Sequence, residues 1–99
     1  MKMKLVNHGD NGELFIEGRL DTNTTPEAEE VFQQMTERFQ TLTLNMEKLE
    51  YVSSAGLRAL KRLHVGMAKK GGALELKQVN RMVMEVFEMT GFAGLLKFV

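Results

Sequence analysis

Two adjacent serines, Ser53 and Ser54, stand where an amphipathic helix is expected to begin, in the stretch EYVSSAGLRALKRLH (residues 50–64). The backbone N–H groups of a first helical turn have no partner inside the helix, and a serine oxygen can accept one of them as an N-cap. A hydroxyl beside the small residues Ala55 and Gly56 is also open to a kinase, and the helix dipole stabilises the resulting phosphate. Phosphorylation adds roughly −1.5 to −2 charges at neutral pH, so one serine can switch a protein interface.

Nucleophilic hydrolysis is the third chemistry open to a serine, and the sequence argues against it. The segment VSSAG does not match the G-x-S-x-G turn of serine hydrolases. His64 lies further along the same predicted helix, about 15 Å from Ser54 at a rise of ~1.5 Å per residue, and His8 falls in a predicted turn. Neither carboxylates nor histidines cluster at the spacing of metal ligands. We therefore predict a protein that is not an enzyme and has no metal and no cofactor.

Composition limits the classes of protein and of partner. With 99 residues, of which 43% are hydrophobic, the chain can form one compact domain. Lys and Arg number 13, as do Asp and Glu, so no overall charge favours nucleic acid or an anionic membrane. The absence of cysteine excludes disulfides and thiolate chemistry. No segment approaches the ~20 apolar residues of a membrane span, and the N-terminus lacks the apolar core of a signal peptide. We expect a cytoplasmic protein without direct membrane insertion.

The apolar pattern predicts the elements that position the two serines. Residues 1–5 and 13–20 alternate as strands on either side of HGDNG, in which Asn11-Gly12 is a strong hairpin signal. Further strands are expected at 41–46, 73–79 and 95–99, and helices along the apolar stripes 28–39, 57–67 and 83–87.

Alternation of strands and helices predicts right-handed crossovers and a largely parallel sheet. We therefore expect an α/β fold over residues 1–99: a mixed sheet of four to five strands, an N-terminal hairpin, and three or more helices mainly on one face. Two start signals compete at the first helix. They are Thr25 before Pro26 and a capping box of Thr24 and Glu27, and the sequence does not choose between them.

Three segments resemble the STAS domain family, especially the bacterial anti-sigma factor antagonists. GRLDTNTTPEAEE is similar to the family's strand, Asp-containing loop and first helix. LNMEKLEYVSSAGLRAL is similar to its central strand, phosphorylatable serine and second helix, and NRMVMEVFEMTGF to its last helix with a Thr-Gly pair. The resemblance covers nearly the whole chain in the same order. It implies a STAS-like mixed sheet, which agrees with the sheet expected from the alternation of strands and helices.

The resemblance implies that Ser54 is phosphorylated by an anti-sigma factor serine kinase and that Asp21 lies beside it. Family members bind the kinase when unphosphorylated, release it when phosphorylated, and are restored by a metal-dependent serine phosphatase. The chain departs from the family's Asp-Ser-Ser/Thr pattern, because Ser53 replaces the acid and Ala55 the residue after the acceptor. We interpret Ser54 as both helix cap and switch, with Ser53 as a strand-end replacement for the acid or as an alternative acceptor. The competing hypothesis is a non-phosphorylated subunit of a transporter-regulatory or lipid-transport assembly.

The predicted partner-binding residues surround the acceptor. They are Asp21, Thr22, Ser53, Ala55, Gly56, Leu57, Arg58, Lys61 and Arg62. Asp21 has an alternative role in an Asx-type turn, and Arg58, Lys61, Arg62 and Lys69 form either a solvated face or a docking surface for an acidic partner.

Eight methionines leave a further question open. Met82, Met84 and Met89 cannot all face inward from one helix, so we expect at least one of them to be exposed. A core role is preferred for the methionines, and an interface role stays open. The sequence does not decide whether the domain forms a weak homodimer.

Overall fold

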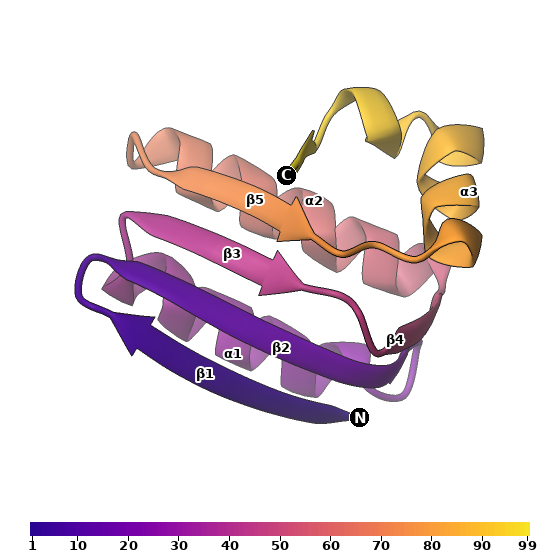
Figure 1. Ribbon diagram of the computed structural model, residues 1–99, viewed down its shortest axis with the longest axis horizontal. Coiled ribbons are helices and arrows are strands. Elements are labelled where there is room, and N and C mark those ends of the chain that lie inside the picture. The colour runs from indigo at the N-terminus through magenta and orange to yellow at the C-terminus, as the bar shows by residue number, and fades with distance from the viewer.

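The structure, a computed structural model, describes all of residues 1–99 as alternating strands and helices around one sheet (Figure 1). The elements in chain order are β1 Lys2–His8, β2 Asn11–Leu20, α1 Thr25–Arg38, β3 Thr41–Asn45, β4 Leu49–Val52, α2 Ser54–Lys69, β5 Ala73–Lys77, α3 Arg81–Thr90, the 3-10 turn η1 Phe92–Gly94 and β6 Lys97–Phe98. The sheet has the order β1-β2-β3-β5-β6, and β4 pairs separately with the end of β2. Only β1 is antiparallel to its neighbour. The predicted α/β class, N-terminal hairpin and largely parallel sheet are confirmed.

The sheet has six strands, where the sequence predicted four to five. The additional strand, β4, has only four residues, and its buried positions Leu49 and Val52 are its two ends rather than alternate residues. A strand so short and without alternation carries no periodic signal. It pairs with Gly18–Leu20 of β2, with a register shift between Gly18 and Arg19. The first half of β2, Asn11–Phe15, pairs with β3 instead.

The hairpin turn lies two residues earlier than the Asn-Gly signal indicated. Gly9 and Asp10 form the turn, with Gly9 at φ 78°, and His8 pairs with Asn11 across it. Gly12 instead lies within β2, where an added Cβ would come 2.7 Å from the ring of Phe39. Gly12 is therefore required by the packing of the chain that follows α1, not by the turn.

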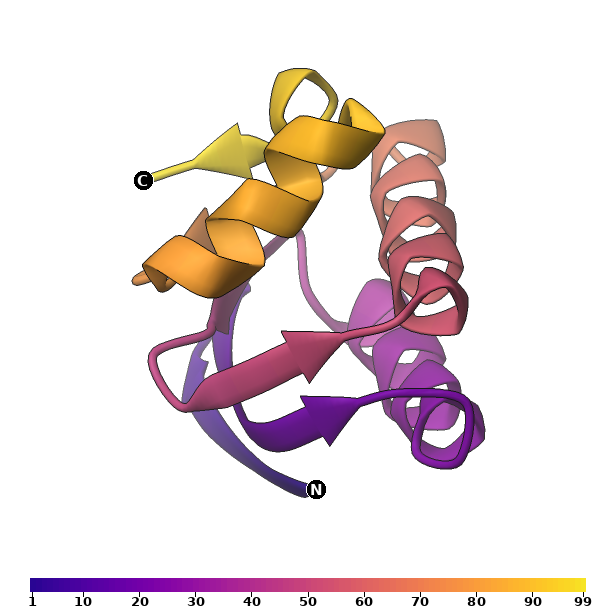
Figure 2. The ribbon, with the colours of Figure 1, turned by 90° about the vertical axis from the view of Figure 1, so that its right-hand side faces the viewer.

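Helices α1 and α2 cover one face of the sheet, and α3 lies beyond the carboxyl ends of β3 and β5, beside β4 (Figures 1 and 2). The apolar residues of alternate strand positions and of the helix stripes form one core of 22 buried side chains. The opposite face of the sheet has no helix over it (Figure 2). None of the helices is long and apolar enough to cross a membrane.

Candidate functional site

The site is built where β2 and β4 end side by side. Leu20 and Val52 are register partners, so Asp21 and Ser53, the residues that follow them, leave the sheet together. The backbone N–H of Ser53 donates to the carbonyl oxygen of Leu20 at 2.9 Å. Gly56 brings the first turn of α2 down onto the same carbonyl, since an added Cβ there would lie 2.7 Å from it. Two segments far apart in the sequence thus form a single edge, the Ser54 edge: residues 21–24 and 53–56.

Ser53, not Ser54, is the N-cap of α2. Its backbone is extended, and its hydroxyl oxygen accepts a hydrogen bond from the N–H of Gly56 at 3.3 Å. Ser54 is the first helical residue; its side chain is exposed and makes no hydrogen bond to the chain. The expectation that Ser54 is the cap was therefore wrong by one residue. With two adjacent serines, both fit the local capping signal, and only the path of β4 decides between them.

Removing each hydroxyl separately tests this assignment. We expect Ser53→Ala to lower the free energy of unfolding by about 1 kcal/mol, because the N–H of Gly56 loses its partner. Ser54→Ala changes an exposed first-turn side chain without a bond and should change stability by less than ~0.5 kcal/mol. Urea unfolding followed by circular dichroism measures both. Equal losses, or a larger loss for Ser54→Ala, would contradict the capping assignment.

Asp21 organises the loop that faces the two serines. Its Oδ1 atom accepts the backbone N–H groups of Asn23 at 3.0 Å and Thr24 at 3.1 Å, an Asx-type turn. The N–H of Asp21 donates in return to the Thr24 hydroxyl at 2.9 Å, and that hydroxyl donates to the carbonyl of Arg19. Of the two predicted starts of α1, the structure has Thr24 at the N-cap position, but its side chain makes no capping hydrogen bond. Thr25 is the first helical residue and donates its hydroxyl to the carbonyl of Asp21.

Asp21 also carries the local negative charge of the edge. Its Oδ2 atom lies 3.6 Å from Nε of Arg19, whose guanidinium stacks 4.2 Å from the ring centre of the exposed Tyr51. The backbone N–H of Thr24 is the main cause that holds the pKa of Asp21 below its ordinary value of 3.8. Sequence reasoning missed Arg19 and Tyr51 because β4, which places Tyr51 beside β2, was not recognised.

The lowered pKa of Asp21 predicts a pH dependence. A carboxylate whose pKa is lower in the folded than in the unfolded chain stabilises the fold above the unfolded value, and this contribution is lost as pH falls through the folded value. Asp21→Asn keeps an oxygen for the Asx turn and removes the charge. We expect its melting temperature to lie below that of wild type at pH 7 and the gap to close below about pH 3.8. A gap that stays constant down to pH 2 would contradict this role.

The cationic face of α2 separates into paired and free residues. Arg62 donates two hydrogen bonds to Glu29 of α1, from Nε to Oε2 at 3.0 Å and from Nη2 to Oε1 at 2.5 Å. The hydrogen bond from Arg62 holds the pKa of Glu29 below its ordinary value. Arg58 and Lys61 are exposed and take part in no ion pair. Arg62 therefore ties α2 to α1, whereas its two neighbours are available to a partner.

The remaining predicted partner residues differ in exposure. Thr22 is exposed and Ala55 is half-buried, but Gly56 and Leu57 are buried. Leu57 belongs to the core and Gly56 touches the end of β2. These two residues position the edge and do not present side-chain atoms to another protein.

Helix α3 lies beside β4 (Figure 2) and carries exposed apolar residues. Met82 is 70% exposed and Met89 is 86% exposed, while Met84 packs half-buried against the core. The prediction that the three cannot all face inward is confirmed, and the preferred core role holds for Met84 alone. Exposed methionines are common on adaptable protein-binding surfaces.

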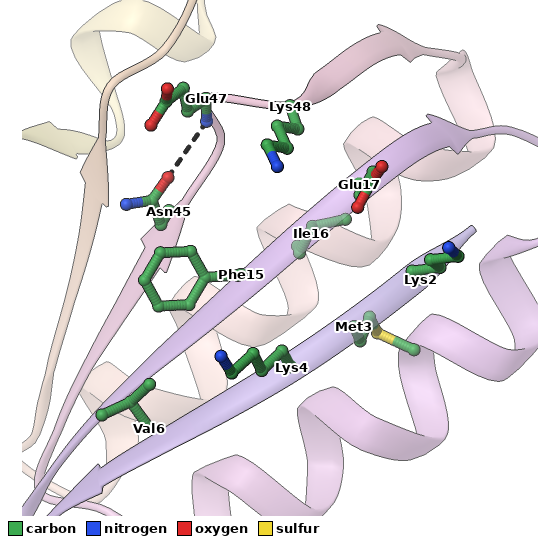
Figure 3. Close-up of a pocket in the computed structure, with 10 residues that line it drawn as sticks. All are labelled: Lys2, Met3, Lys4, Val6, Phe15, Ile16, Glu17, Asn45, Glu47 and Lys48. Carbon is green, nitrogen blue, oxygen red and sulfur yellow. Dashed lines mark hydrogen bonds between the residues drawn. The ribbon is translucent and has the colours of Figure 1, made fainter.

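A separate hollow lies on the sheet face away from α1 and α2, with a volume of about 790 Å³ (Figure 3). Charges of both signs surround Phe15 there: Lys2, Lys4, Lys48, Glu17 and Glu47. Its buried amide, Asn45, donates to Glu13 at 3.0 Å and accepts the N–H of Glu47 at 3.1 Å, so no unpaired buried group points into the hollow. No three His, Asp or Glu side chains gather to hold a metal.

A compact α/β domain with an exposed serine at a strand-to-helix edge defines a class that comparisons with known proteins identify. The STAS domain model matches residues 2–99, and the chain belongs to this family. No curated protein sequence matches it.

Solved structures of anti-sigma factor antagonists share the fold. Unphosphorylated SpoIIAA has a TM-score of 0.83 at 16% identity, over 99% of this chain and 88% of the other. The phosphorylated form of SpoIIAA from Bacillus gives 0.77 at 15% identity, over 99% and 91%. An antagonist from Mycobacterium paratuberculosis gives 0.86 at 16% identity, over 98% and 83%.

Proposed function

We propose that this chain is an anti-sigma factor antagonist that binds a serine-kinase anti-sigma factor and is released when Ser54 is phosphorylated. The observation that carries the proposal is that only one of the two serine hydroxyls is used by the fold. Ser53 uses its oxygen to cap α2, and Ser54 is left exposed with a hydroxyl that nothing in the chain occupies. The fold similarity to an antagonist solved in both phosphorylated and unphosphorylated forms supports the same function.

The proposed switch requires no catalysis by this chain. The kinase transfers the γ-phosphoryl group of ATP to Oγ of Ser54, the hydroxyl proton leaves, and ADP is released. Ser54 is favoured over Ser53 as acceptor because its side chain is exposed and makes no hydrogen bond, whereas the Ser53 hydroxyl is half-buried and bound to the N–H of Gly56. A metal-dependent serine phosphatase would return the chain to its binding form.

The surface around Ser54 supports a protein partner. Arg58 and Lys61 offer unpaired positive charge, which favours an acidic patch on the kinase. Helix α3, which lies beside β4 (Figure 2), carries the exposed Met82 and Met89, and these offer a partner apolar contacts. A phosphate placed at the edge brings negative charge between these groups and the acidic patch, which weakens the complex.

Reconstitution tests the proposal. The purified chain is incubated with each serine-kinase anti-sigma factor of its own organism, first alone and then with ATP, and complexes are followed by size-exclusion chromatography. We expect one kinase to bind wild type, Ser53→Ala and Ser54→Ala, and to phosphorylate all but Ser54→Ala. Binding without phosphoryl transfer from any kinase would overturn the switch and favour the permanent-subunit alternative.

A further inference from the structure

We infer that Arg58 is the internal counter-ion of phosphorylated Ser54, and that phosphorylation withdraws this arginine from the partner surface. The inference rests on the proposed function for its biological setting and adds a residue that regulates the same site. It makes the switch act twice: a negative charge is added at the edge, and a positive charge is taken from it.

Helical spacing places the two side chains together. Ser54 and Arg58 are both within α2, four residues apart, and both are exposed. Side chains at i and i+4 lie on one face with Cβ atoms about 5–6 Å apart. Helical side chains also lean toward the N-terminus, so the guanidinium of Arg58 covers the turn that begins at Ser54. An arginine fork can donate two parallel hydrogen bonds to phosphate oxygens.

Arg58 is free to respond because nothing else holds it. Arg62, one turn further along α2, is bound to Glu29, and Arg19 is occupied by Asp21 and Tyr51. The side chain of Arg58 forms no ion pair and no hydrogen bond, and the first turn of α2 has no acidic residue that would compete for it. Of the three arginines that flank the edge, only Arg58 has an uncommitted guanidinium.

The consequence is a difference between the two states of the edge. In the unphosphorylated chain, Arg58 and Lys61 both face solvent and can pair with acidic groups of a partner. After phosphorylation, the guanidinium of Arg58 pairs with the phosphate and leaves Lys61 as the unpaired cation. A lysine is a point charge without the planar fork, so arginine is the better counter-ion for this purpose.

The test measures the second ionisation of the phosphate by ³¹P nuclear magnetic resonance. Phosphoserine is installed at position 54 during translation, so the experiment does not depend on any kinase. The second pKa of phosphoserine is ordinarily about 6, and a nearby arginine lowers it by favouring the dianion. We expect Arg58→Gln to raise the titration midpoint by about half a pH unit, and Arg58→Lys to raise it by less.

Lys69→Gln is the matched control, because it removes one positive charge from the last turn of the same helix. It should leave the midpoint within ~0.1 pH unit of wild type, because Lys69 lies at the other end of α2 from Ser54, beyond the Debye length of about 10 Å over which salt screens exposed charges. Equal midpoints for wild type and Arg58→Gln, with both folded by circular dichroism, would overturn the inference and leave the proposed function standing. Failure of the proposed function is a separate result, the absence of phosphate on Ser54 in cells.

Discussion

Replacing Ser54 with Asp is expected to weaken binding of the kinase partner by about 10- to 100-fold, while the fold remains intact. The substitution adds a fixed negative charge at the exposed start of α2, where the helix dipole tolerates it. The loss therefore comes from charge repulsion in the complex and not from unfolding. One carboxylate carries less charge than a phosphate, so full phosphorylation should weaken binding further.

Titration calorimetry with the kinase identified by reconstitution measures the effect. Ser54→Ala, which has no charge, should bind like wild type. Gln34→Asp adds the same charge on the exposed side of α1, away from the Ser54 edge, and should also bind like wild type. If Ser54→Asp keeps wild-type affinity, charge at this position does not control the complex, and the phosphoswitch is wrong.

The second large effect concerns how the Ser54 edge is held. Gly56→Ala and Gly66→Ala are the same chemical change in the same helix, but we expect opposite signs. An added Cβ at Gly56 would lie 2.7 Å from the carbonyl oxygen of Leu20, so strand or helix must shift, and we expect a loss of about 1–3 kcal/mol of stability. At Gly66 the Cβ would meet a Thr36 methyl at 3.6 Å, an ordinary contact, and alanine should stabilise the helix by up to ~1 kcal/mol.

Urea unfolding of both variants gives the comparison directly. Similar midpoints for the two variants would mean that the contact between Gly56 and the end of β2 does not constrain the edge. The stability loss of Gly56→Ala should also be accompanied by slower phosphorylation of Ser54, since displacement of the first turn moves the acceptor.

The sequence predicted those helices and strands in which apolar residues recur at a regular helical or strand spacing. The apolar stripes of α1, α2 and α3 and the alternation in β1, β2, β3 and β5 were each sufficient to place an element. β4 was missed because it has four residues and no alternation of apolar and polar side chains. The hairpin turn was predicted two residues too late, because Gly12 is required by its contact with the Phe39 ring and not by the turn. Contacts between distant segments decided both cases, and such contacts are not local sequence signals.

At the candidate site, too, local features could be predicted from the sequence, and those that depend on distant segments could not. Local sequence placed the two serines at the start of a helix and Asp21 in an Asx turn, and the structure has both. Which serine caps the helix depends on the pairing of Val52 with Leu20. The engagement of Arg62 by Glu29 depends on the packing of α1 against α2. Tertiary arrangement therefore decided which polar groups are committed and which remain free for a partner.

The central claim, that Ser54 accepts a phosphoryl group, is tested most directly by the intact mass of the protein isolated from its own cells. The mass is measured with and without phosphatase treatment, under several growth conditions, and the modified residue is mapped by fragmentation. We predict a phosphatase-sensitive increase of about 80 Da located on Ser54. The same increase on Ser53 would keep a phosphoswitch but contradict the assignment of the acceptor. No increase under any condition would contradict the claim and return Ser54 to an ordinary surface residue of a permanent subunit.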